Sequence, residues 1–267
     1  MIVEKRKGPK SIKDLPLNIL ALLNNGEIET VNLMEWLAID SLKLLTNILS
    51  KLDRKQYLNP IENAVGSLKK KTINTINEAI GEGLYIAANT YKDKALFKIL
   101  ATNSSDTVRC WACYCISKNE KLTLAQTLTQ IKPFAADAHF GVREIAWLSV
   151  RPIIAKQIEE SIAILSTWTT SKDENIRRFA SEATRPRGVW CEHIDILKQQ
   201  PEIALSILEP LKNDNALYVQ NSVANWLNDA SKTQPTFVIK LCKKWEKESK
   251  TKATGYIVGR ALRTVEK

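Results

Sequence analysis

Four segments of this chain align with one another without gaps, and their spacing is the feature that most restricts its fold. The segments are TVRCWACYCIS (107–117), GVREIAWLSVR (141–151), NIRRFASEATR (175–185) and YVQNSVANWLN (218–228). Their first aligned aliphatic residues are Val108, Val142, Ile176 and Val219, separated by 34, 34 and 43 residues. Repeats of this length are typical of stacked helix pairs, in which neighbouring units bury one another's apolar faces.

The segments between and before these repeats also have the apolar spacing of helices. They are 122–135, 160–170, 201–213 and 235–247 between the repeats, and 30–52 and 80–101 upstream, with room for one break in 30–52. Pro201 and Pro235 stand where a first helical turn accepts proline. A fifth, degenerate repeat is expected at TGYIVGRALRT (254–264).

No segment has a convincing strand pattern, and the chain contains only 9 glycines and 9 prolines. We therefore expect an all-α fold, a right-handed α-solenoid of HEAT-like helical repeats. It would form a single domain over residues 1–267, with an N-terminal helical cap at 1–100 and the repeat array at 101–267.

The alignment also separates the faces of the repeated helix. When the first aliphatic residue is position zero, positions 0, 4 and 7 are mostly small or apolar, which predicts the packed side. Positions 2, 6 and 9 lie on another side of a helix, and position 5 flanks them. These positions carry Glu144, Trp147, Arg151, Arg178, Glu182, Arg185, Asn221, Asn225 and Asn228. Stacking would join them into a continuous, largely basic surface for a partner.

Charge favours a polyanionic partner. The net charge is +10 and the isoelectric point is about 9.3, which suggests nucleic acid, although a merely soluble basic surface fits equally well. The chain contains no run of 18 apolar residues, so we expect no membrane-spanning helix. The N-terminus lacks the apolar core of a secretory signal.

The five cysteines indicate a reducing, cytoplasmic setting. Cys110, Cys113 and Cys115 crowd onto adjacent turns of one expected helix, where they are poor disulfide partners. With only His139 and His193 as imidazoles, the Cys110–Cys113 pair does not predict a zinc site. We expect neither a metal nor a cofactor, and a monomeric protein.

The third repeat ends unusually, in Arg185-Pro186-Arg187, with Trp190 following. Because Pro186 denies further helix, we expect two guanidinium groups at a rigid helix end, suited to phosphate oxygens. Trp190 is expected either to stack on a ligand or to cover the core. The arginines at position 1, by contrast, are expected to pair with acids of the same or the next repeat. They are Arg109, Arg143 and Arg177.

Two longer stretches, RRFASEATRPRGVW (177–190) and YVQNSVANWLNDASKTQP (218–235), resemble the DNA alkylation repair family, the HEAT-like alkylpurine DNA glycosylases of the AlkC and AlkD type. Residues 27–45 also resemble the N-terminal region of the AlkC type, and the likeness is strongest over 106–234. This resemblance implies double-stranded DNA as partner and cleavage of the N-glycosidic bond of cationic bases such as 3-methyladenine and 7-methylguanine. In the AlkD type, the base is not flipped out of the duplex.

The resemblance places the catalytic residues less directly. The tryptophan and aspartate of the AlkD type fall at Ser105 and Arg109, and its second tryptophan falls at Glu182. The AlkC pattern EFAIRP matches WLSVRP (147–152), so that Trp147 replaces a glutamate and Glu144 lies one turn earlier. Glu182, Glu144 and Trp147 are therefore the expected catalytic residues. The expected DNA contacts are Arg151, Arg178, Arg185, Arg187, Trp190, Asn221 and Asn225.

Two alternatives remain open. A relative without catalytic activity that binds damaged or branched DNA would explain the missing tryptophan-aspartate pair. A protein-binding scaffold is the more remote alternative, because HEAT arrays often serve that purpose.

Overall fold

The computed structural model describes residues 6–265, and every regular element in that range is helical. The predicted all-α class is therefore confirmed for the described part of the chain. These residues pack into two compact units. Unit 1 comprises residues 6–121 with Ala138–Ile145, and unit 2 comprises Leu122–Asp137 with residues 146–265. Among the described helices, none has the length and apolar character needed to cross a membrane.

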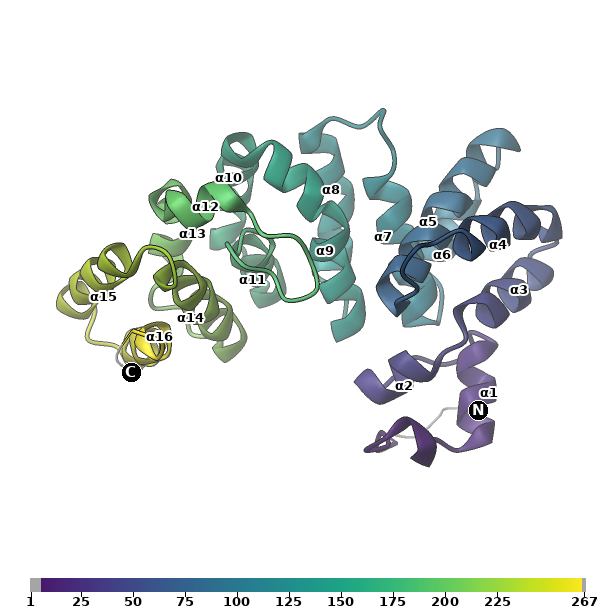
Figure 1. The fold of residues 1–267 in the computed structure, drawn as a ribbon, viewed down its shortest axis with the longest axis horizontal. Helices are drawn as coiled ribbons and strands as arrows, with labels where there is room; N and C mark the ends of the chain where they lie inside the picture. Colours follow the sequence, from purple (N-terminus) through teal and green to yellow (C-terminus); the bar gives the residue numbers. More distant parts are fainter. Residues whose placement is uncertain (1–5, 266–267) are drawn as a thin grey trace. The chain divides into compact units, whose positions relative to one another are not determined.

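Unit 1 contains the N-terminal helices and the first repeat segment (Figure 1). Its elements are η1 (Ile12–Asp14), α1 (Leu17–Asn24), α2 (Leu33–Ala38), α3 (Ser41–Lys51), η2 (Lys55–Tyr57), α4 (Leu58–Gly66), α5 (Ile73–Thr90), α6 (Leu96–Ala101), α7 (Asp106–Ser117) and the beginning of α9 (Phe140–Lys156).

The predicted break in 30–52 lies at Ile39 and Asp40. Asp40 has extended backbone, and its carboxylate accepts a hydrogen bond from the Lys43 amide, so that it caps α3. The segment 80–101 likewise contains the end of α5 and the whole of α6.

The core of unit 1 is closed by the packing of α5 against α7. Gly81 lies at their closest approach, because a Cβ there would meet the Tyr114 side chain and stand 2.9 Å from the Trp111 carbonyl oxygen. The Trp111 indole is fully buried and donates to Asn77 Oδ1 at 2.8 Å. A small residue in α5 and a large one in α7 thus determine how closely these helices pack.

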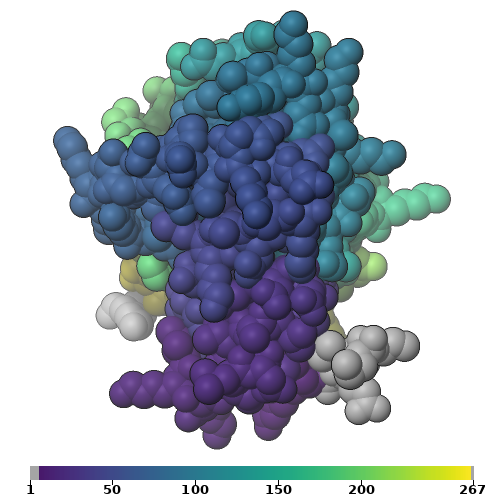
Figure 2. Space-filling model, turned by 90° about the vertical axis from the view of Figure 1, so that its right-hand side faces the viewer, coloured from purple at the N-terminus to yellow at the C-terminus, as the bar shows by residue number. Residues whose placement is uncertain are grey.

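The N-terminal segment of unit 1 is fixed to its later helices by buried polar contacts. Asp106 at the start of α7 accepts hydrogen bonds from the Thr30 amide at 3.1 Å and its hydroxyl at 2.7 Å. His139 Nδ1 lies 3.4 Å from the same carboxylate. Figure 2 shows one face of this unit, where the purple N-terminal residues lie against the blue-violet helices that follow.

Unit 2 contains the later repeats (Figure 1). Its elements are α8 (Leu124–Ala135), the rest of α9, α10 (Ile158–Ser166), η3 (Thr167–Thr170), α11 (Glu174–Ala183), α12 (Asp195–Gln199), η4 (Pro201–Ala204), α13 (Leu205–Leu208), η5 (Glu209–Leu211), α14 (Leu217–Ser231), α15 (Pro235–Glu248) and α16 (Lys252–Leu262). The helix expected over 201–213 is instead three short elements in succession. Pro201 and Pro235 do occupy first helical turns.

Repeated packing of equivalent helices builds the core of unit 2. Helix α14 packs against α11 and against α16, and α15 covers both α14 and α16. The predicted packed positions are confirmed in α14, where Val219, Val223 and Trp226 are fully buried, and in α11, where Ala180 and Ala183 are fully buried. Trp168 and Trp245 also belong to the core, whereas Trp36 is half-buried.

Helix α7 packs with α5 and α6 and so belongs to unit 1, and the subdivision at residue 100 stays a prediction. The single-domain organisation stays a prediction.

Candidate nucleic-acid interface

Three helices of unit 2 are connected along one side by polar and aromatic side chains. The Arg178 guanidinium on α11 lies 4.2 Å from the centre of the Tyr218 ring on α14. The Tyr256 hydroxyl on α16 donates to Asn221 Oδ1 of α14 at 2.8 Å, and Arg263, which follows α16, donates to Asn225 Oδ1 at 3.0 Å. We name this surface the α11–α14–α16 face and define it by Arg178, Tyr218, Asn221, Asn225, Tyr256, Arg260 and Arg263.

The α11–α14–α16 face presents cations to solvent. Arg260 and Arg263 are exposed, and the Arg260 guanidinium lies 5.4 Å from the Tyr256 ring centre. Partial burial, and then the neighbouring charge of Arg260, lower the pKa of Arg263 from its ordinary value. Crowded guanidinium groups are favourable positions for a phosphate, whose charge relieves their repulsion.

The α16 part of this face was not found by aligning the repeats from an aliphatic residue. Position zero in α16 is occupied by Thr254, which is fully buried and donates to the Lys212 carbonyl oxygen at 3.0 Å. Counted from Thr254, Tyr256, Arg260 and Arg263 stand at positions 2, 6 and 9. An alignment that accepted threonine at position zero would have found them.

Position 9 has a different role from the one predicted. Arg151 on α9 is only 3% exposed. It donates hydrogen bonds to the carbonyl oxygen of Ala183, the last residue of α11, at 2.9 Å and to that of Arg185 at 2.6 Å. Asn228 is also buried, and donates to the Ala261 carbonyl oxygen at 3.0 Å. Arg151 and Asn228, both at position 9, therefore form hydrogen bonds with carbonyl groups at the end of the next repeated helix. Helix C-termini leave carbonyl groups without helical partners, which explains this pairing.

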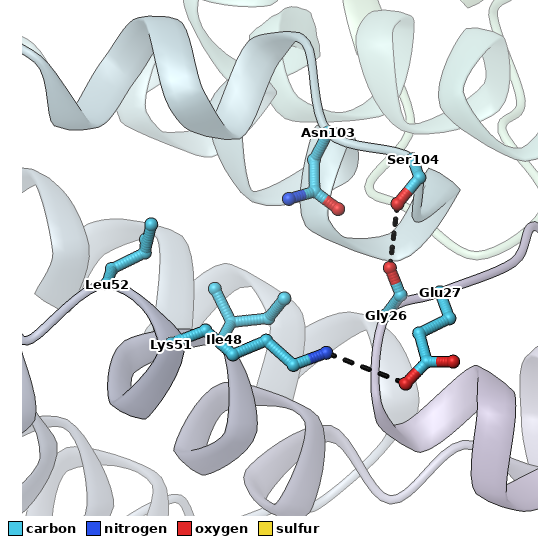
Figure 3. Close-up of a pocket in the computed structure, with 7 residues that line it drawn as sticks. All are labelled: Gly26, Glu27, Ile48, Lys51, Leu52, Asn103 and Ser104. Atoms are coloured by element: carbon cyan, nitrogen blue, oxygen red, sulfur yellow. Dashed lines mark hydrogen bonds and ion pairs between the residues drawn. The ribbon is translucent and has the colours of Figure 1, made fainter.

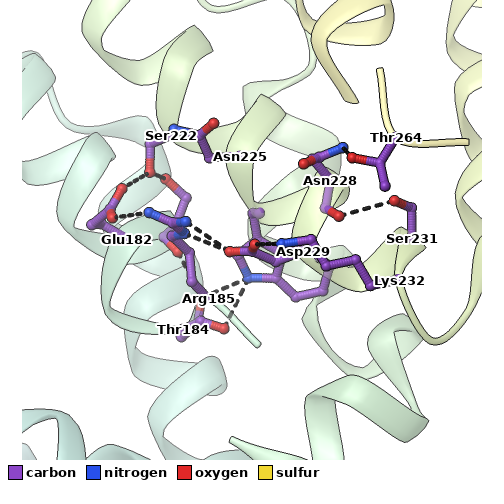
Figure 4. Close-up of polar contacts among 12 residues, drawn as sticks. Glu182, Thr184, Arg185, Ser222, Asn225, Asn228, Asp229, Ser231, Lys232 and Thr264 are labelled. Atoms are coloured by element: carbon purple, nitrogen blue, oxygen red, sulfur yellow. Dashed lines mark hydrogen bonds and ion pairs between the residues drawn. The ribbon is translucent and has the colours of Figure 1, made fainter. Parts of the chain in front are cut away.

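Arg185, also at position 9, donates hydrogen bonds to a carboxylate of the next repeated helix and not to carbonyl oxygens. It donates to Asp229 Oδ2 at 3.0 and 2.7 Å and to Glu182 Oε1 at 2.7 Å (Figure 4). Lys232 in turn lies 3.2 Å from Asp229 Oδ1. Asp229 on α14 is the acceptor shared by Arg185 and Lys232. The guanidinium that we expected on a phosphate is thus occupied by two carboxylates.

Glu182, the first of the expected catalytic residues, is 5% exposed and fully engaged. Besides its ion pair with Arg185, the Glu182 carboxylate lies 3.5 Å from the Arg178 guanidinium and accepts a hydrogen bond from the Ser222 hydroxyl at 2.7 Å. Burial by itself raises the pKa of this carboxyl, but Arg178, Arg185 and the hydrogen bond from Ser222 outweigh it, so its pKa lies below the ordinary value. Glu182 is consequently a carboxylate at neutral pH and a weak base.

The other two expected catalytic residues lie on α9. Trp147 is 6% exposed and belongs to unit 2, whereas Glu144 is half-buried and lies in the part of α9 that belongs to unit 1. Neither prediction of a catalytic role is tested by these positions.

Among the expected DNA contacts, Arg178, Asn221 and Asn225 come together on the α11–α14–α16 face. Arg187 is half-buried, and its buried Nε has no hydrogen-bond partner among the described residues. Trp190 is 83% exposed. These two residues lie on the loop after α11, not on the helix.

The prediction that the position-1 arginines pair with acids of the same or the next repeat is confirmed for Arg177, whereas Arg109 pairs with an acid that precedes the repeats. Arg109 forms an ion pair with Glu29 at 2.5 Å, and Arg177 forms one with Asp214 at 2.6 Å. Arg143 donates to the Ala138 carbonyl oxygen at 2.8 Å. These arginines stabilise the loops around their helices.

Unit 1 has a separate open recess of about 380 Å³ (Figure 3). Gly26, Glu27, Ile48, Lys51, Leu52, Asn103 and Ser104 line it. Its two charged residues, Lys51 and Glu27, lie 3.7 Å apart, and Ser104 donates to the Gly26 carbonyl oxygen. Neighbours inside the recess thus satisfy these groups. No cluster of His, Cys, Asp or Glu suited to a metal ion occurs among residues 6–265.

Comparison with known proteins gives one family. Residues 117–256 match the model described as DNA alkylation repair enzyme. Among curated proteins, the uncharacterised protein YhaZ of Bacillus subtilis (strain 168) is 39% identical over 146 residues, which are 55% of this chain and 40% of YhaZ.

Several solved structures share the fold. The Pseudomonas fluorescens alkylpurine DNA glycosylase AlkC, bound to DNA containing an abasic site analogue, matches with a TM-score of 0.67 and 22% identity. That match covers 98% of this chain and 66% of AlkC, so the chain spans somewhat less than two thirds of that protein. AlkD2 from Streptococcus mutans matches with a TM-score of 0.56 and 22% identity, over 78% of this chain and 97% of AlkD2.

Proposed function

Because this chain belongs to the DNA alkylation repair enzyme family, we propose that it binds double-stranded DNA through the α11–α14–α16 face and acts on alkylated bases. The observation that carries the proposal is the connected row of arginine, amide and tyrosine side chains across three successive helices. Arginines in such a row contact phosphates, and amide and tyrosine groups add hydrogen bonds to the backbone of the duplex.

The net charge of +10 supports the same partner. Phosphate contacts give sequence-independent affinity that falls steeply with salt. The similarity to AlkC, solved on DNA with an abasic site analogue, supports DNA as the ligand. The protein would act as a monomer in the cytoplasm and would be associated with the nucleoid when bound to DNA.

The reaction we propose is hydrolysis of the N-glycosidic bond of cationic N3- or N7-alkylated purines, without base flipping. A base that already carries positive charge leaves readily, so the protein has only to stabilise the cationic sugar and position water. Glu182 is a carboxylate next to Arg178 of the proposed interface, at 3.5 Å, and it also pairs with Arg185 at 2.7 Å. In this position it would act by its negative charge, since its lowered pKa makes it a poor proton acceptor.

A second function is favoured by the same geometry. The two arginines beside Glu182 neutralise the charge that would stabilise a cationic sugar. A family member that binds damaged DNA without cutting it would have no need of a free carboxylate. The two functions predict the same interface and differ only in base release.

The deciding experiment is single-turnover release of 3-methyladenine and 7-methylguanine from methylated duplex DNA. Glycosylase activity requires release above the uncatalysed rate and its loss in Glu182→Gln, with DNA affinity retained. Glu174→Gln, on the exposed first turn of α11, is the matched control. Binding without any release assigns the non-catalytic function. Absence of DNA binding at about 0.1 M salt contradicts both functions and favours a protein-binding scaffold.

A further inference from the structure

The loop that follows α11 exposes a large aromatic side chain. Trp190 is 83% exposed and its neighbour Val189 is 59% exposed. The other six tryptophans of the chain are buried or half-buried. Large apolar side chains that stand together in solvent commonly mark a binding surface.

The loop is closed at its base, so it presents Trp190 from a fixed support. Buried Arg151 donates to the carbonyl oxygens of Arg185 at 2.6 Å and Glu192 at 3.2 Å, which flank the loop. The Ile194 amide also donates to the Pro186 carbonyl oxygen at 3.0 Å. A Cβ on Gly188 would overlap the Cys191 sulfur, so the chain is tightly folded here.

The backbone at the tip of this loop is strained. Trp190 has φ 106°, a conformation that residues with a side chain rarely adopt. Strain of this kind persists where the surrounding structure imposes it, and it is concentrated at ligand sites. Here it holds a tryptophan in solvent, where the ring contributes little to folding.

The position of the loop determines what the ring can meet. The loop follows α11, whose Arg178 belongs to the proposed DNA interface, and its sequence carries Arg187 and His193 as well as Trp190. An exposed aromatic ring together with cationic side chains is the combination with which proteins stack on unpaired bases.

We propose that Trp190 stacks on an unpaired or unstacked base, so that the protein prefers DNA with an interrupted base stack to intact duplex. This inference rests on the proposed function, because it requires DNA to be the partner. The loop adds selectivity for disrupted DNA, while the α11–α14–α16 face supplies affinity for any duplex.

The test compares dissociation constants for intact duplex and for the same duplex with one unpaired base, using fluorescence anisotropy. Trp190→Ala is expected to weaken binding to the interrupted duplex by roughly 5- to 150-fold, the range for loss of one base–aromatic stack. The same substitution should change the dissociation constant for intact duplex by no more than about twofold. Trp190→Phe keeps an aromatic ring and is expected to restore most of the preference. Leu217→Ala, which removes another exposed apolar side chain of unit 2, is the matched control.

Folding is checked separately with Trp190→Gly. Glycine adopts positive φ without strain. The urea midpoint of this variant should therefore equal or exceed that of the wild type, while the preference for the interrupted duplex is lost. A fall in midpoint together with the loss of preference would show that Trp190 supports the fold and would overturn the proposal.

The remaining outcomes separate this inference from the proposed function. If the wild type binds both duplexes equally, or Trp190→Ala weakens both equally, the stacking role is wrong while DNA binding stands. If the wild type binds neither duplex, the proposed function fails and the stacking role fails with it.

Discussion

Arg185 places Nε and Nη2 on the same oxygen of Asp229, at 3.0 and 2.7 Å, and so fixes the end of α11 to α14. The two side chains keep only 13% and 8% of their exposure. Both residues therefore belong to the support beneath the proposed interface, and their loss should first affect stability.

We expect Arg185→Ala, or Asp229→Asn, to lower the free energy of unfolding by up to about 3–5 kcal/mol, because each removes the main partner of a buried charge and leaves only one weaker or shared partner beside it. Urea denaturation measures this change. Lys232→Ala is the control, since Lys232 pairs with the same carboxylate but is 42% exposed, and its loss should cost less than about 1 kcal/mol. Equal effects of Arg185→Ala and Lys232→Ala would contradict the structural role.

DNA affinity should depend on the exposed arginines of the α11–α14–α16 face. Arg260→Ala and Arg263→Ala are each expected to weaken binding across sequences and to reduce the slope of log affinity against log salt by about one. The reason is that each variant removes one cation that would release a counterion from the DNA. Binding titrations between about 50 and 200 mM salt measure the slope.

Lys240→Ala on the exposed side of α15 serves as the control for charge alone. A loss of slope equal to that of the Arg260 and Arg263 variants would mean that net charge, and not the α11–α14–α16 face, determines binding.

Asp93 in unit 1 should make stability pH-dependent in acid. Its hydrogen bond from Arg54 is the main cause that lowers the pKa of the carboxyl from 3.8 to about 2; burial opposes this, and the Tyr57 hydroxyl adds to it. A carboxyl with a lowered pKa in the folded state stabilises the protein fully above its unfolded pKa. That stabilisation is lost as the pH falls from about 4 to about 2.

Asp93→Asn removes this contribution, so its unfolding free energy should be lower than that of the wild type at neutral pH by about 1–2 kcal/mol. The difference should shrink toward pH 2, which urea titrations at several pH values measure. Asp53→Asn is the control, because Asp53 is exposed. A difference that stayed constant down to pH 2 would exclude the carboxylate as its source.

Two glycine substitutions should have opposite signs. Gly81→Ala should destabilise the protein by about 1–3 kcal/mol, because its Cβ would press on α7 at the Trp111 carbonyl group. Gly259→Ala, inside α16 with nothing within 4 Å of the added atom, should stabilise it by up to about 1 kcal/mol through helix propensity. Thermal melts compare the two, and a Gly81→Ala protein as stable as the wild type would contradict the close approach of α5 and α7.

Sequence periodicity was sufficient for most of the helices and for the packed side of the repeats. Val219, Val223 and Trp226 recur at helical spacing and are fully buried. This information is local, because the side of a helix on which a residue lies depends only on its distance along the chain. The break between α2 and α3 and the first-turn prolines followed from equally local rules.

The candidate site was predicted only in part. Arg178, Asn221 and Asn225 were correctly placed on one face, but Arg260 and Arg263 were missed because a buried threonine, Thr254, occupies the aliphatic position of their repeat. The prediction that position 9 continues the face did not anticipate the hydrogen bonds that Arg151 and Asn228 donate to carbonyl oxygens of the next repeated helix.

The sequence alone thus determined the repeated helices and their apolar sides, since both depend on spacing within a single helix. Only the tertiary structure decided which arginines remain available to a partner. A guanidinium near a helix end is equally able to bind a phosphate, a carbonyl oxygen or a carboxylate. Which of these Arg185 meets depends on where the next repeat places Asp229, 44 residues later.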